Sequence, residues 1–179
     1  MRITLALLLG AWLMGTLLLA GVASENFFII DRLLNSSASS SFSSHPAFQK
    51  DVAQLPPGEA RITLRYVSSE MNRLYFVVWG WIELVIAVLV LALAMESVRR
   101  MKFTIVFSLM LLAVAVMVFY ITPEITQVGR ALDYVPRDPK PPELAHFGML
   151  HGLYSVLDLL KLVLGFWMAA ALVRLPPVE

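Results

Sequence analysis

Ionisable side chains stand inside two long apolar runs, and their types are suited to proton or ion chemistry. One run contains Glu83, and the last run of the chain contains His151, Asp158 and Lys161. A charge at the centre of a bilayer costs about 2.5–3.5 kcal/mol even on the mildest scale, so we expect these groups to face a partner and not lipid. Groups of this kind relay protons, bind a polar ligand or hold helices together.

Spacing predicts that the last run presents a polar stripe. Residues three, four or seven positions apart share one helical face, and this rule groups His151, Tyr154, Ser155 and Asp158. Lys161 follows Asp158 by three residues, within reach of a salt bridge. We therefore expect the stripe to be buried at membrane depth.

Glu83 is the matching group on another helix. It lies about nine residues into its run, which is about 14 Å at the rise of an α-helix. Antiparallel packing would place it at the depth of the stripe, so we predict a contact from Glu83 to His151 or Lys161. We name the predicted intramembrane cluster by its members: Glu83, His151, Tyr154, Ser155, Asp158 and Lys161.

Two interpretations of this cluster stay open. It is either a structural clasp that fixes the pairing of helices, or a site for an ion, a proton or a polar ligand. Four spans enclose too little room for a wide pathway, which favours the clasp.

A second polar group is predicted at the outward ends of two helices. We expect this outer cluster to tie helices together at the membrane surface, and the alternative is a surface for a partner or substrate. Its members are Glu70, Asn72, Arg73, Glu124, Gln127 and Arg130.

Metal and catalytic motifs are missing from the sequence. The chain has no cysteine, and His146 and His151 are five residues apart, on different faces of a helix, so no metal site is predicted. The chain contains no nucleophile elbow, phosphate-binding glycine loop or dinucleotide fingerprint, so we expect no enzyme and no catalytic residue. Structural lipids are expected; a haem or chlorophyll held by His151 stays an alternative.

Four apolar runs of roughly bilayer length predict an all-α, polytopic membrane protein. The sequence is 59% hydrophobic and 15% charged, more apolar surface than a soluble domain of 179 residues can bury. A net charge of +1 argues against a nucleic-acid partner. We predict one domain over 1–179, a four-helix bundle with spans at about 3–22, 74–96, 103–121 and 146–173.

The first two long helices are predicted to extend beyond the membrane. Helical spacing continues from Ile3 to Leu34, about 48 Å of helix against a hydrocarbon core of about 30 Å. The second helix is predicted over 59–98, after an outward connection at 35–57 that contains a serine-rich segment. A second outward connection, 122–145, is expected to begin with a short helical segment; its Pro123 can kink or end the third helix.

Basic residues predict the orientation. The short loop with Arg99, Arg100 and Lys102 is expected to stay cytoplasmic, and Arg2 and Arg174 fall on the same side of a four-span bundle. Both termini are therefore expected in the cytoplasm. The protein is expected to lie in a bacterial inner membrane. The first run also resembles a signal peptide, but its spanning length favours an uncleaved helix.

The ordered set of motifs resembles an uncharacterised membrane family, the domain-of-unknown-function group 4149, which is similar to transmembrane protein 205. The resemblance covers nearly all of the chain. It implies a four-helix membrane domain and transfers no catalytic residue, because the family has no settled activity. The motifs are Trp12-Leu13-Met14-Gly15, Ser69-Glu70-Met71-Asn72-Arg73, Pro123-Glu124-Ile125 and Leu150-His151-Gly152, with Tyr154, Ser155, Asp158 and Lys161.

Without a catalytic constellation, we expect an accessory or scaffold subunit of a larger membrane complex, with lipids and other membrane subunits as partners. The first alternative is a small transporter or proton-coupled protein that uses Glu83, His151, Asp158 and Lys161. The second alternative is a subunit that contacts a pigment or haem through His151.

Overall fold

Helices account for nearly all of the residues that the computed structural model describes, which are 1–35, 45–56, 58–135 and 138–176. No strand occurs among them, which confirms the all-α prediction. The elements are α1 (Arg2–Asn35), α2 (Pro46–Val52), α3 (Glu59–Ser97), α4 (Met101–Val116), the π-helix η1 (Met117–Ile121), α5 (Thr122–Ala131) and α6 (Glu143–Val173).

Within the described residues, four helical segments are long and apolar enough to cross a membrane: α1, α3, the continuous segment Met101–Ala131, and α6. Their positions agree with the four predicted spans. α1 has 34 residues and α3 has 39, so at about 1.5 Å per residue both are longer than a bilayer core of about 30 Å. The ends of both helices lie within one residue of those predicted.

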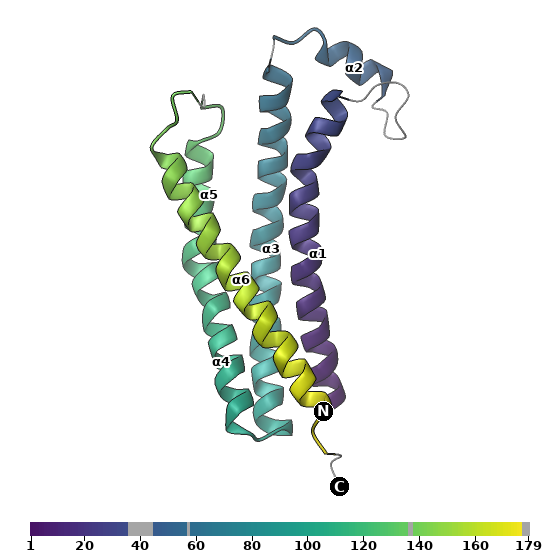
Figure 1. The fold of residues 1–179 in the computed structure, drawn as a ribbon, viewed down its shortest axis with the longest axis vertical. Helices are drawn as coiled ribbons and strands as arrows, with labels where there is room; N and C mark the ends of the chain where they lie inside the picture. The colour runs from purple at the N-terminus through teal and green to yellow at the C-terminus, as the bar shows by residue number, and fades with distance from the viewer. Residues whose placement is uncertain (36–44, 57, 136–137, 177–179) are drawn as a thin grey trace.

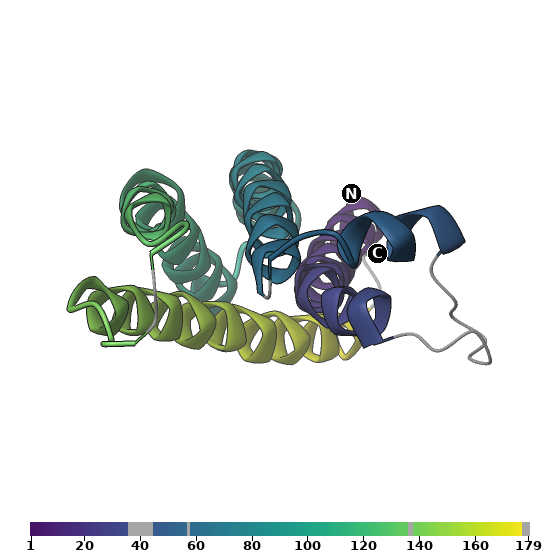
Figure 2. The same ribbon diagram turned by 90° about the horizontal axis from the view of Figure 1, so that it is seen from above.

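The helices form a row with one helix laid across it. α1, α3 and the α4–α5 segment stand side by side, and α6 crosses in front of them at an angle (Figures 1 and 2). α6 lies against α1 near the two chain termini and against α5 at the opposite end, which we call the distal end (Figure 1). The distal end comprises α2, α5, the last part of α1 and the first parts of α3 and α6.

Close helix contacts hold the half of the bundle near the termini. An added Cβ on Gly15 of α1 would lie 2.0 Å from the Trp79 ring of α3, and one on Gly165 of α6 would lie 2.4 Å from Leu13 of α1. Small residues therefore let α1 approach both neighbours closely. The largest fully buried side chains in this half include Trp12, Phe103, Phe107 and Met110.

The third helix passes Pro123 without ending. The Thr122 N–H donates to the carbonyl of Met117, five residues back, in place of the usual four. Pro123 has no N–H to offer the carbonyl of Phe119, and the wider π-helical turn just before it accommodates this missing bond. The helix continues as α5, close to the short segment that the sequence predicts.

Both predicted outward connections contain a helix. α5 occupies the start of 122–145, and α2 lies within 35–57, where the sequence analysis predicts no helix. Pro46 stands in the first turn of α2, and the His45 side chain caps it by accepting the Ala47 N–H. The serine-rich segment at 36–44 lies outside the described residues.

Candidate functional site

A buried ion pair joins α3 to α6 near the middle of the bundle. The Lys161 ammonium lies 2.5 Å from Glu83 Oε1 and 2.8 Å from Asp158 Oδ1. Glu83 and Lys161 are 1% and 2% exposed. The predicted contact between Glu83 and Lys161 is confirmed. No ion pair or hydrogen bond joins Glu83 to His151 in the part of the chain that the structure describes.

Helix α1 contributes two neutral donors to the same carboxylate. The Trp12 indole N–H donates to Glu83 Oε1 at 2.6 Å, and the Thr16 hydroxyl donates to it at 3.4 Å. The sequence analysis missed both residues. A buried tryptophan usually finds an acceptor for its N–H. This general requirement is the signal in the sequence from which a role for Trp12 could have been predicted. We call Trp12, Thr16, Glu83, Asp158 and Lys161 the buried clasp.

The predicted polar stripe of α6 is buried only in part. Tyr154 is buried, but His151 and Ser155 are exposed. The buried face of α6 contains Leu150, Tyr154 and Lys161, and His151 and Ser155 each follow a buried residue by one position, about 100° around the helix. The Ser155 hydroxyl donates back to the His151 carbonyl at 2.9 Å. The prediction of one buried stripe is therefore corrected.

The distal end contains a second charged group, formed by Glu70, Arg73, Arg130 and Asp133. Arg73 donates to Asp133 at 2.8 and 3.0 Å and to Glu70 at 2.5 Å, and Arg130 lies 3.3 Å from Glu70. Hydrogen bonds from Arg130 and then from Arg73 lower the pKa of Glu70 below its ordinary value. We call these four residues the distal ion cluster. With two cations and two carboxylates it is neutral overall.

Asn72, predicted with that group, belongs to a separate contact between α1 and α3. Its amide donates to the Ala23 carbonyl at 2.9 Å, and its carbonyl oxygen accepts from the Asn26 amide at 2.6 Å. The Ser68 hydroxyl donates to the Asn26 carbonyl at 2.8 Å. These bonds join the parts of α1 and α3 that extend toward the distal end.

The remaining members of the predicted outer cluster do not meet at one point. Glu124 lies 3.9 Å from His146 and links α5 to α6, and Gln127 is exposed. Asp133, which the sequence analysis missed, completes the cluster around Arg73. It follows the last turn of α5, near the predicted end of the short helical segment, and only the folded path of the chain brings it to α3.

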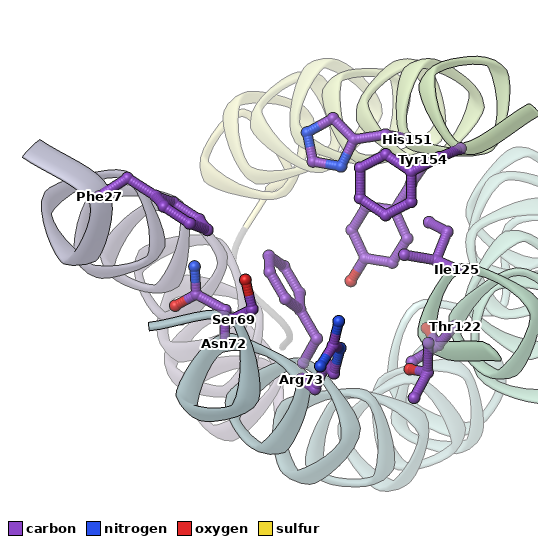
Figure 3. Close-up of a pocket in the computed structure, with 11 residues that line it drawn as sticks. Phe27, Ser69, Asn72, Arg73, Thr122, Ile125, His151 and Tyr154 are labelled. Carbon is purple, nitrogen blue, oxygen red and sulfur yellow. The ribbon is translucent and has the colours of Figure 1, made fainter. Parts of the chain in front are cut away.

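A cavity of about 120 Å³ lies between α1, α3, α5 and α6 at the distal end (Figure 3). The sequence analysis did not predict this cavity. Two pairs of rings form part of its wall. Phe76 contacts Tyr154 edge to face, with ring centroids 5.3 Å apart, and Phe147 stacks on His151 with ring centroids 6.1 Å apart. Its lining consists of Phe27, Ser69, Asn72, Arg73, Phe76, Thr122, Ile125, Thr126, Phe147, His151 and Tyr154.

Five polar side chains in this lining make no hydrogen bond among the described residues: Ser69, Thr122, Thr126, His151 and Tyr154. In the described part of the chain no hydrogen bond is made by the Tyr154 hydroxyl or by the His151 imidazole. Figure 3 shows the Tyr154 hydroxyl pointing into the cavity, toward the side on which Arg73 lies. Of the predicted intramembrane cluster, Glu83, Asp158 and Lys161 therefore lie in the clasp and His151 and Tyr154 line the cavity, while Ser155 belongs to neither.

Among the described residues, no group of three or more His, Asp or Glu side chains could hold a metal ion. No family model, curated protein or solved structure matches the chain. The resemblance to the domain-of-unknown-function group 4149 and to transmembrane protein 205 therefore stays a prediction.

Proposed function

We propose that this protein is a non-catalytic integral membrane protein that serves as an accessory or scaffold subunit of a larger membrane complex. The observation that carries the proposal is the buried clasp, because its charges are fully engaged with one another. The clasp thereby fixes α1, α3 and α6 to each other, while much of the outer surface of the bundle stays open to lipid or to a partner.

The clasp has the properties of a structural joint. Glu83 accepts from Lys161 on α6 and from Trp12 and Thr16 on α1, so three helices meet at one carboxylate. No charged member of the clasp lines the distal cavity. A buried pair of this kind can fix the register of helices, and removing one partner strands the other charge.

An uncovered face of the row gives a partner a place to pack. α6 crosses one side of the row (Figure 2), and α1 and α4 flank α3. The remaining side of α3 presents a stripe of exposed apolar residues at helical spacing. We propose that helices of other membrane subunits, together with lipids, cover this stripe, whose members are Val78, Trp81, Ile82, Val85 and Leu89.

The proposed location is a bacterial inner membrane, with both termini in the cytoplasm. Both termini and the short α3–α4 connection lie at the same end of the bundle (Figure 1). That connection carries Arg99, Arg100 and Lys102, so basic residues gather at this end, as the positive-inside rule requires of a cytoplasmic side.

Site-specific photo-cross-linking in intact membranes tests the proposal. A benzoylphenylalanine at Val85, on the uncovered face of α3, is compared with one at Val163, which is exposed on α6. Purification in mild detergent and mass spectrometry then identify what is attached. A membrane subunit that co-purifies in fixed stoichiometry and cross-links through Val85 but not Val163 supports the proposal. A chain that runs alone and gives no protein cross-link from either position contradicts it.

A small transporter or proton-coupled protein is the second candidate, and Asp158 favours it. The Asp158 side chain is 21% exposed while it contacts the buried Lys161, so it links the pair to the surface. Proton flux in liposomes containing wild-type protein, lost in a folded Asp158→Asn variant, would favour transport over the structural role. The absorbance spectrum of the same preparation tests the third candidate, a haem or chlorophyll at His151.

A further inference from the structure

The distal cavity is lined by exposed residues of α1 and α6, which give it a side entrance between these two helices. α6 lies against α1 near the termini and moves away from it toward the distal end (Figure 1). Phe27 of α1 and His151 of α6 stand on opposite sides of the cavity (Figure 3), and both are exposed. These residues lie close to the ends of the predicted spans. A molecule dissolved in the bilayer can therefore reach the cavity sideways, with its head near the membrane surface.

The cavity offers hydrogen-bond donors that the protein itself does not use. Tyr154 is 7% exposed, and its hydroxyl points into the cavity without a hydrogen-bond partner among the described residues. This hydroxyl opens into the cavity, where an acceptor oxygen of an occupant gives it a hydrogen bond. The His151 imidazole is a second available donor on the same helix. An occupant that presents two acceptor oxygens would satisfy both groups.

The charge around the cavity favours a neutral occupant. Arg73 is the cationic side chain in the lining, and it is held by Asp133 and Glu70. The whole distal ion cluster sums to zero, so a phosphate or carboxylate headgroup would compete with two carboxylates that already hold Arg73. A neutral carbonyl oxygen meets no such competition at Tyr154 or His151.

The walls favour a flat ring. Phe27, Phe76 and Phe147 surround the cavity together with the rings of Tyr154 and His151. Aromatic walls with a few placed polar groups are typical of sites for planar ligands. From the donors, the neutrality, the rings and the side entrance we infer that the cavity binds the headgroup of an isoprenoid quinone, with its tail leaving between α1 and α6.

Titration of the purified full chain with decylubiquinone, followed by native mass spectrometry, tests this inference. The Tyr154→Phe variant removes the hydroxyl and keeps the ring that packs on Phe76. We expect one saturable site in the wild type and about fivefold weaker binding in this variant, the loss of one hydrogen bond. The matched control is Tyr120→Phe, because Tyr120 is exposed on η1 and does not line the cavity. It should bind like the wild type.

A variant whose larger side chain fills the cavity provides a second test of quinone binding. Ser69→Phe should abolish binding, and a melting curve shows whether the variant is folded; Thr126→Leu replaces it if it is not. Absence of saturable binding to the folded wild type would overturn the inference. Binding by the Tyr154→Phe variant and by the filled variant that equals binding by the wild type would also overturn it. If phosphatidylglycerol displaces the quinone from the wild type but not from the Tyr154→Phe variant, the cavity binds an anionic lipid and the inference is overturned. The assay uses the isolated chain, so a missing partner subunit does not affect it.

Discussion

The buried clasp and the distal ion cluster both use charges to join α3 to another helix, but they do so in different surroundings. In the clasp, the Glu83 and Lys161 side chains are 1% and 3% exposed. In the distal ion cluster the corresponding values are 12% for Arg73 and 62% for Arg130. The clasp combines the neutral donors Trp12 and Thr16 with one cation between two carboxylates, whereas the distal ion cluster balances two cations against two carboxylates.

The difference shows that ion pairs between helices tolerate the loss of a partner differently when they are buried and when they are near water. Away from water, each charge depends on a fixed partner, because the field between charges is strong and an unpaired charge is very costly. Near water, solvent and salt replace much of what a lost partner supplied. We therefore expect the clasp to fix helix register, and the distal end to tolerate change beside the cavity.

Breaking the clasp should have the largest effect. Lys161→Met leaves the Glu83 carboxylate without its cation, and we expect the free energy of unfolding to fall by about 3–5 kcal/mol. Denaturant titration in detergent micelles, followed by circular dichroism, measures the loss. Lys102→Met, at an exposed lysine, is the control and should change little.

The double variant Glu83→Gln/Lys161→Met sharpens this result. It removes the charges of Glu83 and Lys161 and keeps an oxygen that accepts from Trp12. Asp158 also loses its cation, but its side chain is 21% exposed to solvent, so most of the stability lost in Lys161→Met should return. A double variant no more stable than Lys161→Met would show that the pair contributes more than mutual neutralisation, against a purely structural clasp.

Breaking the distal ion cluster should have a smaller effect. Arg73→Met leaves Asp133 and Glu70 partly exposed to water, so we expect a loss of about 1–3 kcal/mol, reduced at high salt. The control is Arg61→Met, because Arg61 and Asp31 form an exposed pair that is expected to contribute about 0–1 kcal/mol. A loss as large as that of Lys161→Met would remove the contrast between the two regions.

Acid should weaken the distal ion cluster selectively, with the smallest effect. Glu70 lies outside the predicted span 74–96, and its pKa in the folded protein lies below its ordinary value of 4.5. Its stabilising contribution is therefore complete above that value and is lost as the pH falls through the folded-state pKa. Melting temperatures are measured from pH 7 to below the ordinary pKa of a glutamate. The melting temperature of the Glu70→Gln variant should fall less over this range than that of the wild type. Glu25→Gln, in an exposed pair with Arg32, should show the same fall as the wild type.

Hydropathy and helical spacing were sufficient to predict the long helices and one contact of the site. The runs are long and uninterrupted, so the ends of α1 and α3 could be located closely. The partner of Glu83 could be narrowed to His151 or Lys161, because few other polar groups lie at one depth in an apolar bundle, and the structure shows that it is Lys161.

The cavity and the full set of clasp partners could not be predicted, because both depend on how α6 crosses the row. Spacing alone does not give a crossing angle, and it therefore did not separate buried Tyr154 from exposed His151 and Ser155. Trp12 follows an ordinary packing pattern, and only the position of Glu83 shows which acceptor it meets. Asp133 lies beyond the last turn of α5, where periodicity carries no information.

The π-helical turn over Met117–Ile121 holds one residue more than an α-helical turn. A single deletion within this turn would close it to an α-helical turn and keep the same face of α5 toward the cavity. A single deletion in the regular part of α4 would instead rotate α5 by about 100° relative to the residues before it. Ile125 and Thr126 would then leave the cavity wall although no lining residue had changed. The shape of this cavity is thus recorded in the length of the third helix as well as in its side chains.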